Sequence, residues 1–129
     1  MFERDFTITV ADDNRGVLEL VSRVLRMQGY QVLEANSGPE ALHVAERHDR
    51  PVDLLLTDVE MPNVDGIELI RRVRAQDKLR RLPIIVLSTR GSAEDKQRAL
   101  RAGADAYLVK AEFSEQVLRD ALARQLGGA

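Results

Sequence analysis

The 129-residue sequence contains no cysteine, which excludes a disulfide framework and any metal site built on thiolates. It has no apolar run near the roughly 20 residues that a membrane-spanning helix needs. Its first residues, MFERDF, lack the basic segment and apolar core of a secretory signal peptide. From these absences we expect a soluble protein of the cytoplasm that has no membrane partner.

An excess of positive charge is missing as well. The chain has 19 basic and 21 acidic residues and a formal net charge of −2. A protein that binds nucleic acid normally presents a basic face, so we do not expect nucleic acid as a direct partner. No linker or low-complexity tract interrupts the chain, and its length suits one core. We predict a single domain over residues 1–129, with its core at about residues 6–126.

Five apolar or β-rich segments alternate with five helical patterns. The expected strands are residues 6–11, 31–35, 52–57, 84–87 and 106–109. Candidate N-caps, namely Asn14, Ser92 and Ser114, precede apolar positions at helical spacing. Leu20 and Val117 are among the residues expected on the inner helix faces. The alternation predicts an α/β fold with a doubly wound parallel sheet and helices on both faces.

Polar residues close four of the predicted strands. They are Asp12 with Asp13, Asp58, Ser88 and Lys110. Parallel strands bring their carboxyl ends to the same edge of a sheet, where ligands of α/β proteins bind. We therefore expect these side chains to meet at one rim.

This rim has the chemistry of phosphoryl transfer. Three carboxylates repel one another unless a cation lies among them, and oxygen ligands favour Mg²⁺ or Mn²⁺ over zinc. Lys110 adds a positive charge that can pair with Asp58 and with phosphate oxygens, and Ser88 adds a hydroxyl donor. The residues predict that Asp58 accepts a phosphoryl group, with catalysis by positioning and charge neutralisation.

At these positions the chain resembles the receiver domain of bacterial two-component response regulators, the CheY-like family. The resemblance covers roughly residues 6–126. It rests on the acidic pair 12–13 and on the strings DVEMPNVDG at 58–66, LPIIVLS at 82–88 and GADAYLVK at 103–110. It implies a flavodoxin-like strand order of 2-1-3-4-5.

The resemblance also implies a role for each site residue. Asp58 would be the phosphoacceptor, and Lys110 would bind the phosphate. Asp13 and Asp58 would bind Mg²⁺ directly, with the backbone carbonyl of Glu60, and Asp12 would act through water. Two further residues would change position on phosphorylation. Ser88 would be the switch hydroxyl that moves to meet the phosphoryl group, and Tyr107 would be the aromatic switch that swings inward with it.

The implied partners follow from the family. A sensor histidine kinase or its phosphotransfer domain would donate the phosphoryl group from a phosphohistidine. The surface of the fourth helix, fifth strand and fifth helix would then act on a downstream protein or a fused kinase module. No enzymatic activity is expected beyond Mg²⁺-dependent phosphorylation and dephosphorylation of Asp58 itself.

The sequence departs from the family pattern at two places, and a hypothesis concerns two further residues that would line the phosphoryl site. Ala111 replaces the usual proline after the lysine, and a cis bond without proline costs about 2.5–4 kcal/mol, so a cis bond is not assumed. Thr89 stands where a smaller residue is usual, which narrows access to Asp58. Glu60 and Arg90 are hypothesised to pair across the mouth of the site and slow water attack, which an unchanged dephosphorylation rate in Arg90→Ala would contradict.

A finer resemblance concerns residues 92–113. They are similar to receivers fused to the carboxyl end of chemotaxis-type hybrid histidine kinases, which often lack the proline and carry a phenylalanine after the lysine, as Phe113 is here. The hypothesis is that this chain is such a domain in isolation.

Rival interpretations stay open. The main alternative is a binding module of the same fold that never takes phosphate. An aspartate-nucleophile phosphatase with Glu60 as general acid is a second, which the lack of a cap domain disfavours. A dinucleotide-binding module is a third, but the first β-α turn has no G-x-G-x-x-G run.

Single residues also have plainer roles. Tyr107 taken alone fits a partly buried core aromatic better than a switch. His43 and His48 are interpreted as surface residues, and the charge run Arg71–Arg74 as a solvated helix face.

Overall fold

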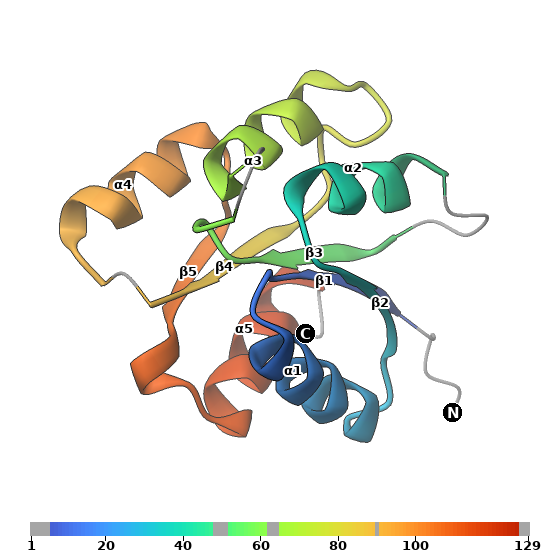
Figure 1. Cartoon of the computed structure of the whole chain (residues 1–129), viewed down its shortest axis with the longest axis vertical. Coiled ribbons are helices and arrows are strands. Elements are labelled where there is room, and N and C mark those ends of the chain that lie inside the picture. The colour runs from blue at the N-terminus through green and yellow to red at the C-terminus, as the bar shows by residue number, and fades with distance from the viewer. Residues whose placement is uncertain (1–5, 48–51, 62–64, 90, 127–129) are drawn as a thin grey trace.

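The computed structural model describes residues 6–47, 52–61, 65–89 and 91–126, and it contains a five-stranded parallel sheet (Figure 1). The strands lie in the order β2-β1-β3-β4-β5. Their bounds are Thr7–Ala11 for β1, Gln31–Ala35 for β2, Leu54–Thr57 for β3, Ile84–Ser88 for β4 and Ala106–Val109 for β5. The predicted fold class and strand order are confirmed, and the most polar strand, β2, is an edge.

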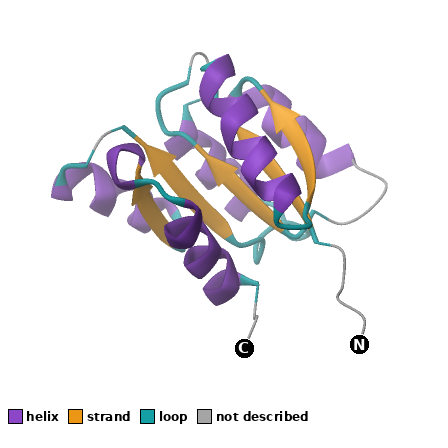
Figure 2. Cartoon of the chain, turned by 90° about the horizontal axis from the view of Figure 1, so that it is seen from below, coloured by secondary structure: helices purple, strands orange, loops and turns teal. Residues whose placement is uncertain are grey.

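Helices cover both faces of the sheet (Figures 1 and 2). One face carries α2 (Gly38–Arg47), α3 (Gly66–Ala75) and α4 (Ala93–Ala102), and the other carries α1 (Arg15–Met27) and α5 (Glu115–Gln125). A 3₁₀ turn at Lys110–Glu112 joins β5 to α5. None of the described helices has the length and apolar character needed to cross a membrane.

Side-chain caps begin the helices directly after the loops at the strand ends. The backbone amides of Val17, Asp95 and Val117 donate to the predicted caps Asn14, Ser92 and Ser114, each at 3.1 Å. Helix α3 has a cap that the sequence analysis did not single out. Asp65 accepts a hydrogen bond from the amide of Glu68 at 2.9 Å. Each cap satisfies an amide that the helix itself leaves unpaired, so the helix starts are well defined.

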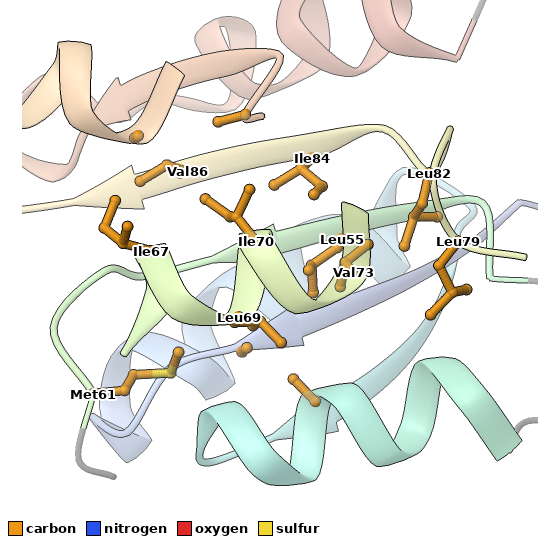
Figure 3. Close-up of a cluster of buried hydrophobic side chains, with 14 of the residues drawn as sticks. Leu55, Met61, Ile67, Leu69, Ile70, Val73, Leu79, Leu82, Ile84 and Val86 are labelled. Atoms are coloured by element: carbon orange, nitrogen blue, oxygen red, sulfur yellow. The ribbon is translucent and has the colours of Figure 1, made fainter. Parts of the chain in front are cut away.

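Two hydrophobic cores lie on opposite faces of the sheet. Figure 3 shows one of them, where Ile70 and Val73 of α3 lie over Leu55 and Ile84 of the sheet. The other packs α1 and α5 against the opposite face. Consecutive residues of β3 alternate between the two cores, so the whole apolar run is buried, as predicted. Burying one leucine fully contributes roughly 1.5–3 kcal/mol, so β3 is anchored from both sides.

The expected inner faces of two helices are partly wrong. Leu20 is 51% exposed and Val117 is 37% exposed. In α1 the buried stripe instead runs through Leu18, Val21 and Leu25. Each helical residue turns by about 100°, so Leu20 lies about 200° around the axis from Leu18 and faces solvent.

Arg74 corrects the prediction of a uniformly solvated charge run. Its side chain is 20% exposed, and its guanidinium donates to the carbonyl oxygens of Arg80, Leu82 and Gly103 at 2.6–3.1 Å. It also pairs with Asp105 at 3.0 Å. A carbon atom at Gly103, whose φ is 125°, would collide with this side chain. Arg74 is therefore a structural link between α3 and the loops before β4 and β5.

Candidate functional site

Strand register places Asp12 beside Asp58. The last residues of β1 and β3, Ala11 and Thr57, are partners in the sheet, and each is followed by an aspartate. The amide of Asp58 donates to the carbonyl of Ala11 at 2.9 Å, which extends the ladder by one bond. The two carboxylates therefore emerge side by side at the carboxyl edge of the sheet.

Lys110 joins this pair from β5. Its ammonium nitrogen lies 2.9 Å from Oδ2 of Asp12 and 3.1 Å from Oδ2 of Asp58. Burial by itself would lower the pKa of Lys110. The hydrogen bond to Asp12 and the negative charges of Asp58 and Asp12 outweigh the effect of burial, so the net pKa of Lys110 lies above its ordinary value of 10.5. Lys110 is therefore a fixed positive charge at neutral pH.

Backbone amides hold the remaining carboxylate oxygens. Oδ1 of Asp58 accepts hydrogen bonds from the amides of Val59 at 2.7 Å and Glu60 at 3.2 Å, and Oδ1 of Asp12 accepts one from Asn14 at 2.9 Å. Asp12 and Asp58 are only 4% and 5% exposed. Both side chains are therefore held in one orientation, with the Oδ2 atoms turned toward Lys110.

Asp13 completes a cluster of three carboxylates. One oxygen each from Asp12, Asp13 and Asp58 lies within 4.8 Å of the others, and Asp13 is exposed. Three negative charges against the single charge of Lys110 leave an excess of two, which a divalent cation would balance. The donor set is all oxygen, as Mg²⁺ prefers. The residues present fit the predicted metal, whereas the backbone carbonyl of Glu60 as a ligand stays a prediction.

Ser88 and Tyr107 lie on the neighbouring strands β4 and β5. Ser88 ends β4, is fully buried and pairs in the sheet with Val109, the residue before Lys110. Tyr107 is half-buried and packs against the core beneath α3 and α4. Both belong to the strands that carry the site, and their switch roles stay predictions.

Gly66 supports the segment that carries Asp58 in a way that the sequence analysis missed. Its amide donates to the carbonyl of Val59 at 3.0 Å, and a Cβ atom there would collide with the backbone of Asp58 and Val59. The first turn of α3 can approach the end of β3 only because residue 66 has no side chain. The sequence signal for this close approach was a glycine eight residues after the aspartate that ends a strand.

Thr89 makes a contact that was also not anticipated. Its hydroxyl donates to Oε1 of Glu60 at 2.7 Å, which connects the loops after β3 and β4. The hypothesised pairing of Glu60 with Arg90 falls on a residue outside the described part of the chain, and so does the surface prediction for His48. His43 is exposed as predicted. The described residues contain no cis peptide bond, so the bond between Lys110 and Ala111 is trans.

The comparisons with known proteins agree with this geometry. The model of the response regulator receiver domain family matches residues 8–123. The chain is 36% identical over 121 residues to the chemotaxis protein CheY homolog of Campylobacter jejuni, a match that covers 93% of this chain and 92% of that protein.

Two further curated relatives are longer than the region they share with this chain. The response regulator MprA of Mycobacterium leprae is 44% identical over 111 residues, which are 86% of this chain and 47% of MprA. The gliding motility regulatory protein of Myxococcus xanthus is 40% identical over 117 residues, which are 91% of this chain and 15% of that protein. The chain spans less than half the length of these two relatives.

Solved structures share the fold over nearly their whole length. The chemotaxis protein CheY4 of Vibrio cholerae has a TM-score of 0.87 at 34% identity, covering 95% of this chain and 100% of that one. The receiver domain of a sensor histidine kinase from Pseudomonas aeruginosa has a TM-score of 0.87 at 33% identity, covering 96% and 99%. That structure holds a magnesium ion in its active-site cleft. This chain belongs to the receiver domain family of two-component response regulators, which are phosphoacceptor signalling domains that bind Mg²⁺ at an acidic site.

Proposed function

We propose that Asp58 is the phosphoacceptor and that the phosphoryl donor is a phosphohistidine of a sensor histidine kinase or its phosphotransfer domain, in the cytoplasm. In the transfer, an Asp58 oxygen bonds to phosphorus, the bond between phosphorus and the histidine nitrogen breaks, and a proton neutralises the released imidazole. The observation that carries the proposal is the contact of Lys110 with both Asp12 and Asp58, at 2.9 and 3.1 Å. It puts a lasting positive charge where the phosphate oxygens would arrive.

The metal in this proposal is Mg²⁺, with Mn²⁺ as a substitute. The carboxylates of Asp12, Asp13 and Asp58 would hold it, together with the backbone carbonyl of Glu60, and Asp12 would act through water. When bound, the ion supplies charge neutralisation to the phosphoryl oxygens. The residues of the chain supply position. The amides of Val59 and Glu60 fix Asp58.

Ser88 and Tyr107 are proposed as the residues that respond to the phosphoryl group. A phosphoryl group brings added charge and new acceptor oxygens, which the Ser88 hydroxyl and the Lys110 ammonium can bind. Ser88 is fully buried at the end of β4. In this proposal its hydroxyl moves to meet a phosphoryl oxygen, with a local shift of the end of β4. Tyr107 lies on β5 between the core and α4, so such a shift would change the α4-β5-α5 surface.

The proposal treats residues 1–129 as a single domain whose output is a separate protein or a fused kinase module. The likeness to a receiver domain of a Pseudomonas histidine kinase supports the second arrangement, the excised receiver of a hybrid kinase. Catalysis is limited to phosphorylation and dephosphorylation of Asp58 itself.

The test is phosphorylation of the purified chain by acetyl phosphate with Mg²⁺, followed by mass spectrometry. We expect one added phosphoryl group, located on Asp58 by peptide mapping, and none in Asp58→Asn. Chelation of Mg²⁺ should abolish the modification. A chain that remains unmodified but still binds a partner would contradict the proposal and favour the binding module that never takes phosphate.

A further inference from the structure

Two successive peptide units after β3 are each held at both ends. Their amides, those of Val59 and Glu60, donate to Oδ1 of Asp58 at 2.7 and 3.2 Å. The carbonyl oxygen of Asp58 accepts the Thr57 hydroxyl at 2.8 Å. The carbonyl oxygen of Val59 accepts the amide of Gly66 at 3.0 Å. Because a peptide unit is planar, a bond to its carbonyl also fixes the direction of its amide.

The Thr57 hydroxyl is the one bond of this set that a side chain donates. Thr57 ends β3, is 1% exposed, and lies on the same face of the sheet as Leu55 (Figure 3). Among the described residues, its hydroxyl is the only donor to the Asp58 carbonyl. Gly66 packs so closely over this carbonyl that a Cβ atom there would collide with it. Without the hydroxyl, the carbonyl would be buried and unpaired, a state that the backbone avoids by rotating the peptide unit.

Such a rotation would carry the Val59 amide away from the carboxylate, because the amide belongs to the same peptide unit as the Asp58 carbonyl. The Val59 amide is the closer of the two donors to Oδ1 of Asp58. With Oδ1 held, Oδ2 is turned toward the ammonium group of Lys110 at 3.1 Å. The Thr57 hydroxyl therefore controls the orientation of the carboxylate through one peptide unit.

We propose that Thr57 is a positioning residue for phosphoryl transfer, whose hydroxyl holds the Asp58 carboxylate in its reactive orientation before the donor arrives. The proposal rests on Asp58 being the phosphoacceptor. With acetyl phosphate as donor, an Asp58 oxygen bonds to phosphorus, the bond between phosphorus and the acetyl oxygen breaks, and acetate leaves. A carboxylate that is already oriented needs no rearrangement in this step, so the loss of that order slows the transfer.

A pair of substitutions separates the hydroxyl from the shape of the side chain. Thr57→Val keeps the branched shape and removes the donor, whereas Thr57→Ser keeps the donor. With acetyl phosphate and Mg²⁺, we expect Thr57→Val to be labelled about ten to a hundred times more slowly than the unchanged chain, the cost of lost orientation. Thr57→Ser should be labelled at nearly the rate of the unchanged chain. Unchanged labelling of Thr57→Val, or equally slow labelling of both variants, would overturn the proposal.

Thr9 provides the matched control for removing a buried hydroxyl. It is fully buried in β1, the neighbour of β3 in the sheet. Within the described part of the chain, its hydroxyl has no hydrogen-bond partner. Thr9→Val therefore makes the same change without breaking a bond to the site, and it should be labelled like the unchanged chain. Labelling of Thr9→Val as slow as that of Thr57→Val would overturn the proposal.

The amide proton signals of Val59 and Asn14 test the orientation without any phosphoryl group. Both amides donate to carboxylates, Val59 to Asp58 at 2.7 Å and Asn14 to Asp12 at 2.9 Å. A hydrogen bond to a carboxylate moves an amide proton signal downfield, so we expect both signals there in the NMR spectrum of the unchanged chain. In Thr57→Val only the Val59 signal should move upfield. A Val59 signal that stays in place, or that is not downfield in the unchanged chain, would contradict the role of Thr57.

These measurements also separate the role of Thr57 from the function on which it depends. If the unchanged chain takes no phosphoryl group, the proposed function fails, and the Val59 signal still decides whether Thr57 orients the carboxylate. If the unchanged chain and the Thr57 variants are labelled alike, only the role of Thr57 fails. Should Thr57→Val not fold, Thr57→Ser and Thr57→Ala make the same comparison, because they differ by one hydroxyl. Equal labelling rates in that pair would refute the proposal.

Discussion

At the scale of single residues, Lys110 determines the charge balance of the site. Two buried carboxylates share its ammonium group, and both lie within 3.1 Å of it. Removing one partner of a buried ion pair leaves an uncompensated charge, which is more costly than never having had the pair. The same contacts raise the pKa of Lys110 above 10.5, although burial acts in the opposite direction.

This raised pKa predicts a loss of stability in alkali. In the unfolded chain Lys110 releases its proton near the ordinary value of 10.5, whereas the folded chain keeps it to higher pH. Over that interval the native state binds more protons than the unfolded state, so the free energy of unfolding falls as pH rises. Below the ordinary value the full stabilisation from Lys110 is present. Urea unfolding at a series of pH values from about 9 upward measures the slope.

Two substitutions of lysine isolate the contribution of Lys110 to that slope. Lys110→Met should flatten the alkaline loss of stability, because it removes the group whose proton affinity differs between the two states. Lys78→Met changes an exposed lysine far from the carboxylates and should leave the slope as it is. The same alkaline slope in Lys110→Met and in the unchanged chain would contradict the assignment.

At the scale of elements, Arg74 links the C-terminal turn of α3 to two neighbouring loops. Its guanidinium donates to three carbonyl oxygens and to Asp105, and Asp105 in turn accepts the amide of Ile84 at the start of β4 at 2.8 Å. The link lies at the amino end of β4, opposite the edge that carries Asp58. It holds α3 and the turn after α4 in place while the other edge carries the chemistry.

Arg74→Met should therefore lower the free energy of unfolding by about 2–4 kcal/mol, since several charge-assisted hydrogen bonds from a mostly buried side chain are lost. Arg72→Met is the matched control on the same helix. The Arg72 side chain is 50% exposed and pairs with Glu68, so its loss should change stability by no more than about 0.5 kcal/mol. Urea unfolding of both variants measures the difference. Equal effects would mean that Arg74 is an ordinary surface arginine.

At the scale of the whole molecule, the site exists only when separate strands are assembled. The acidic cluster joins the ends of β1 and β3, and Lys110 arrives from β5. An unfolded chain cannot hold these groups together. A cation bound by the cluster therefore stabilises the whole fold by mass action.

Mg²⁺ should raise the free energy of unfolding by about 1.4 kcal/mol at ten times its dissociation constant. Asp13→Asn should abolish most of this gain and leave the metal-free stability nearly unchanged, because Asp13 is exposed. Asp77→Asn removes the same charge at a side chain that is 92% exposed in the loop after α3, and should keep the full gain. Thermal unfolding with and without Mg²⁺ makes the comparison. An equal gain in Asp13→Asn would place the metal elsewhere.

The sequence by itself determined the alternation of strands and helices, the caps at Asn14, Ser92 and Ser114, and the polar residues that end the strands. These features depend on local spacing, and local spacing is visible in the order of residues. The buried run of β3 was predictable for the same reason, because a strand covered on both faces shows no alternation.

Only the tertiary structure decided which long-range contacts those residues make. Arg74 belongs to a run of charged residues whose pattern predicts an exposed helix face. Its side chain is mostly buried because it donates hydrogen bonds to backbone carbonyl groups up to 29 residues away in the sequence. The Thr89–Glu60 bond likewise depends on the register of β3 against β4, which no local pattern encodes. Leu20 and Val117 carry apolar side chains at helical spacing, yet the rotation of each helix against the sheet leaves them in solvent. Periodicity fixes which residues share a helix face, whereas the packing of that face against its neighbours decides which of them are buried.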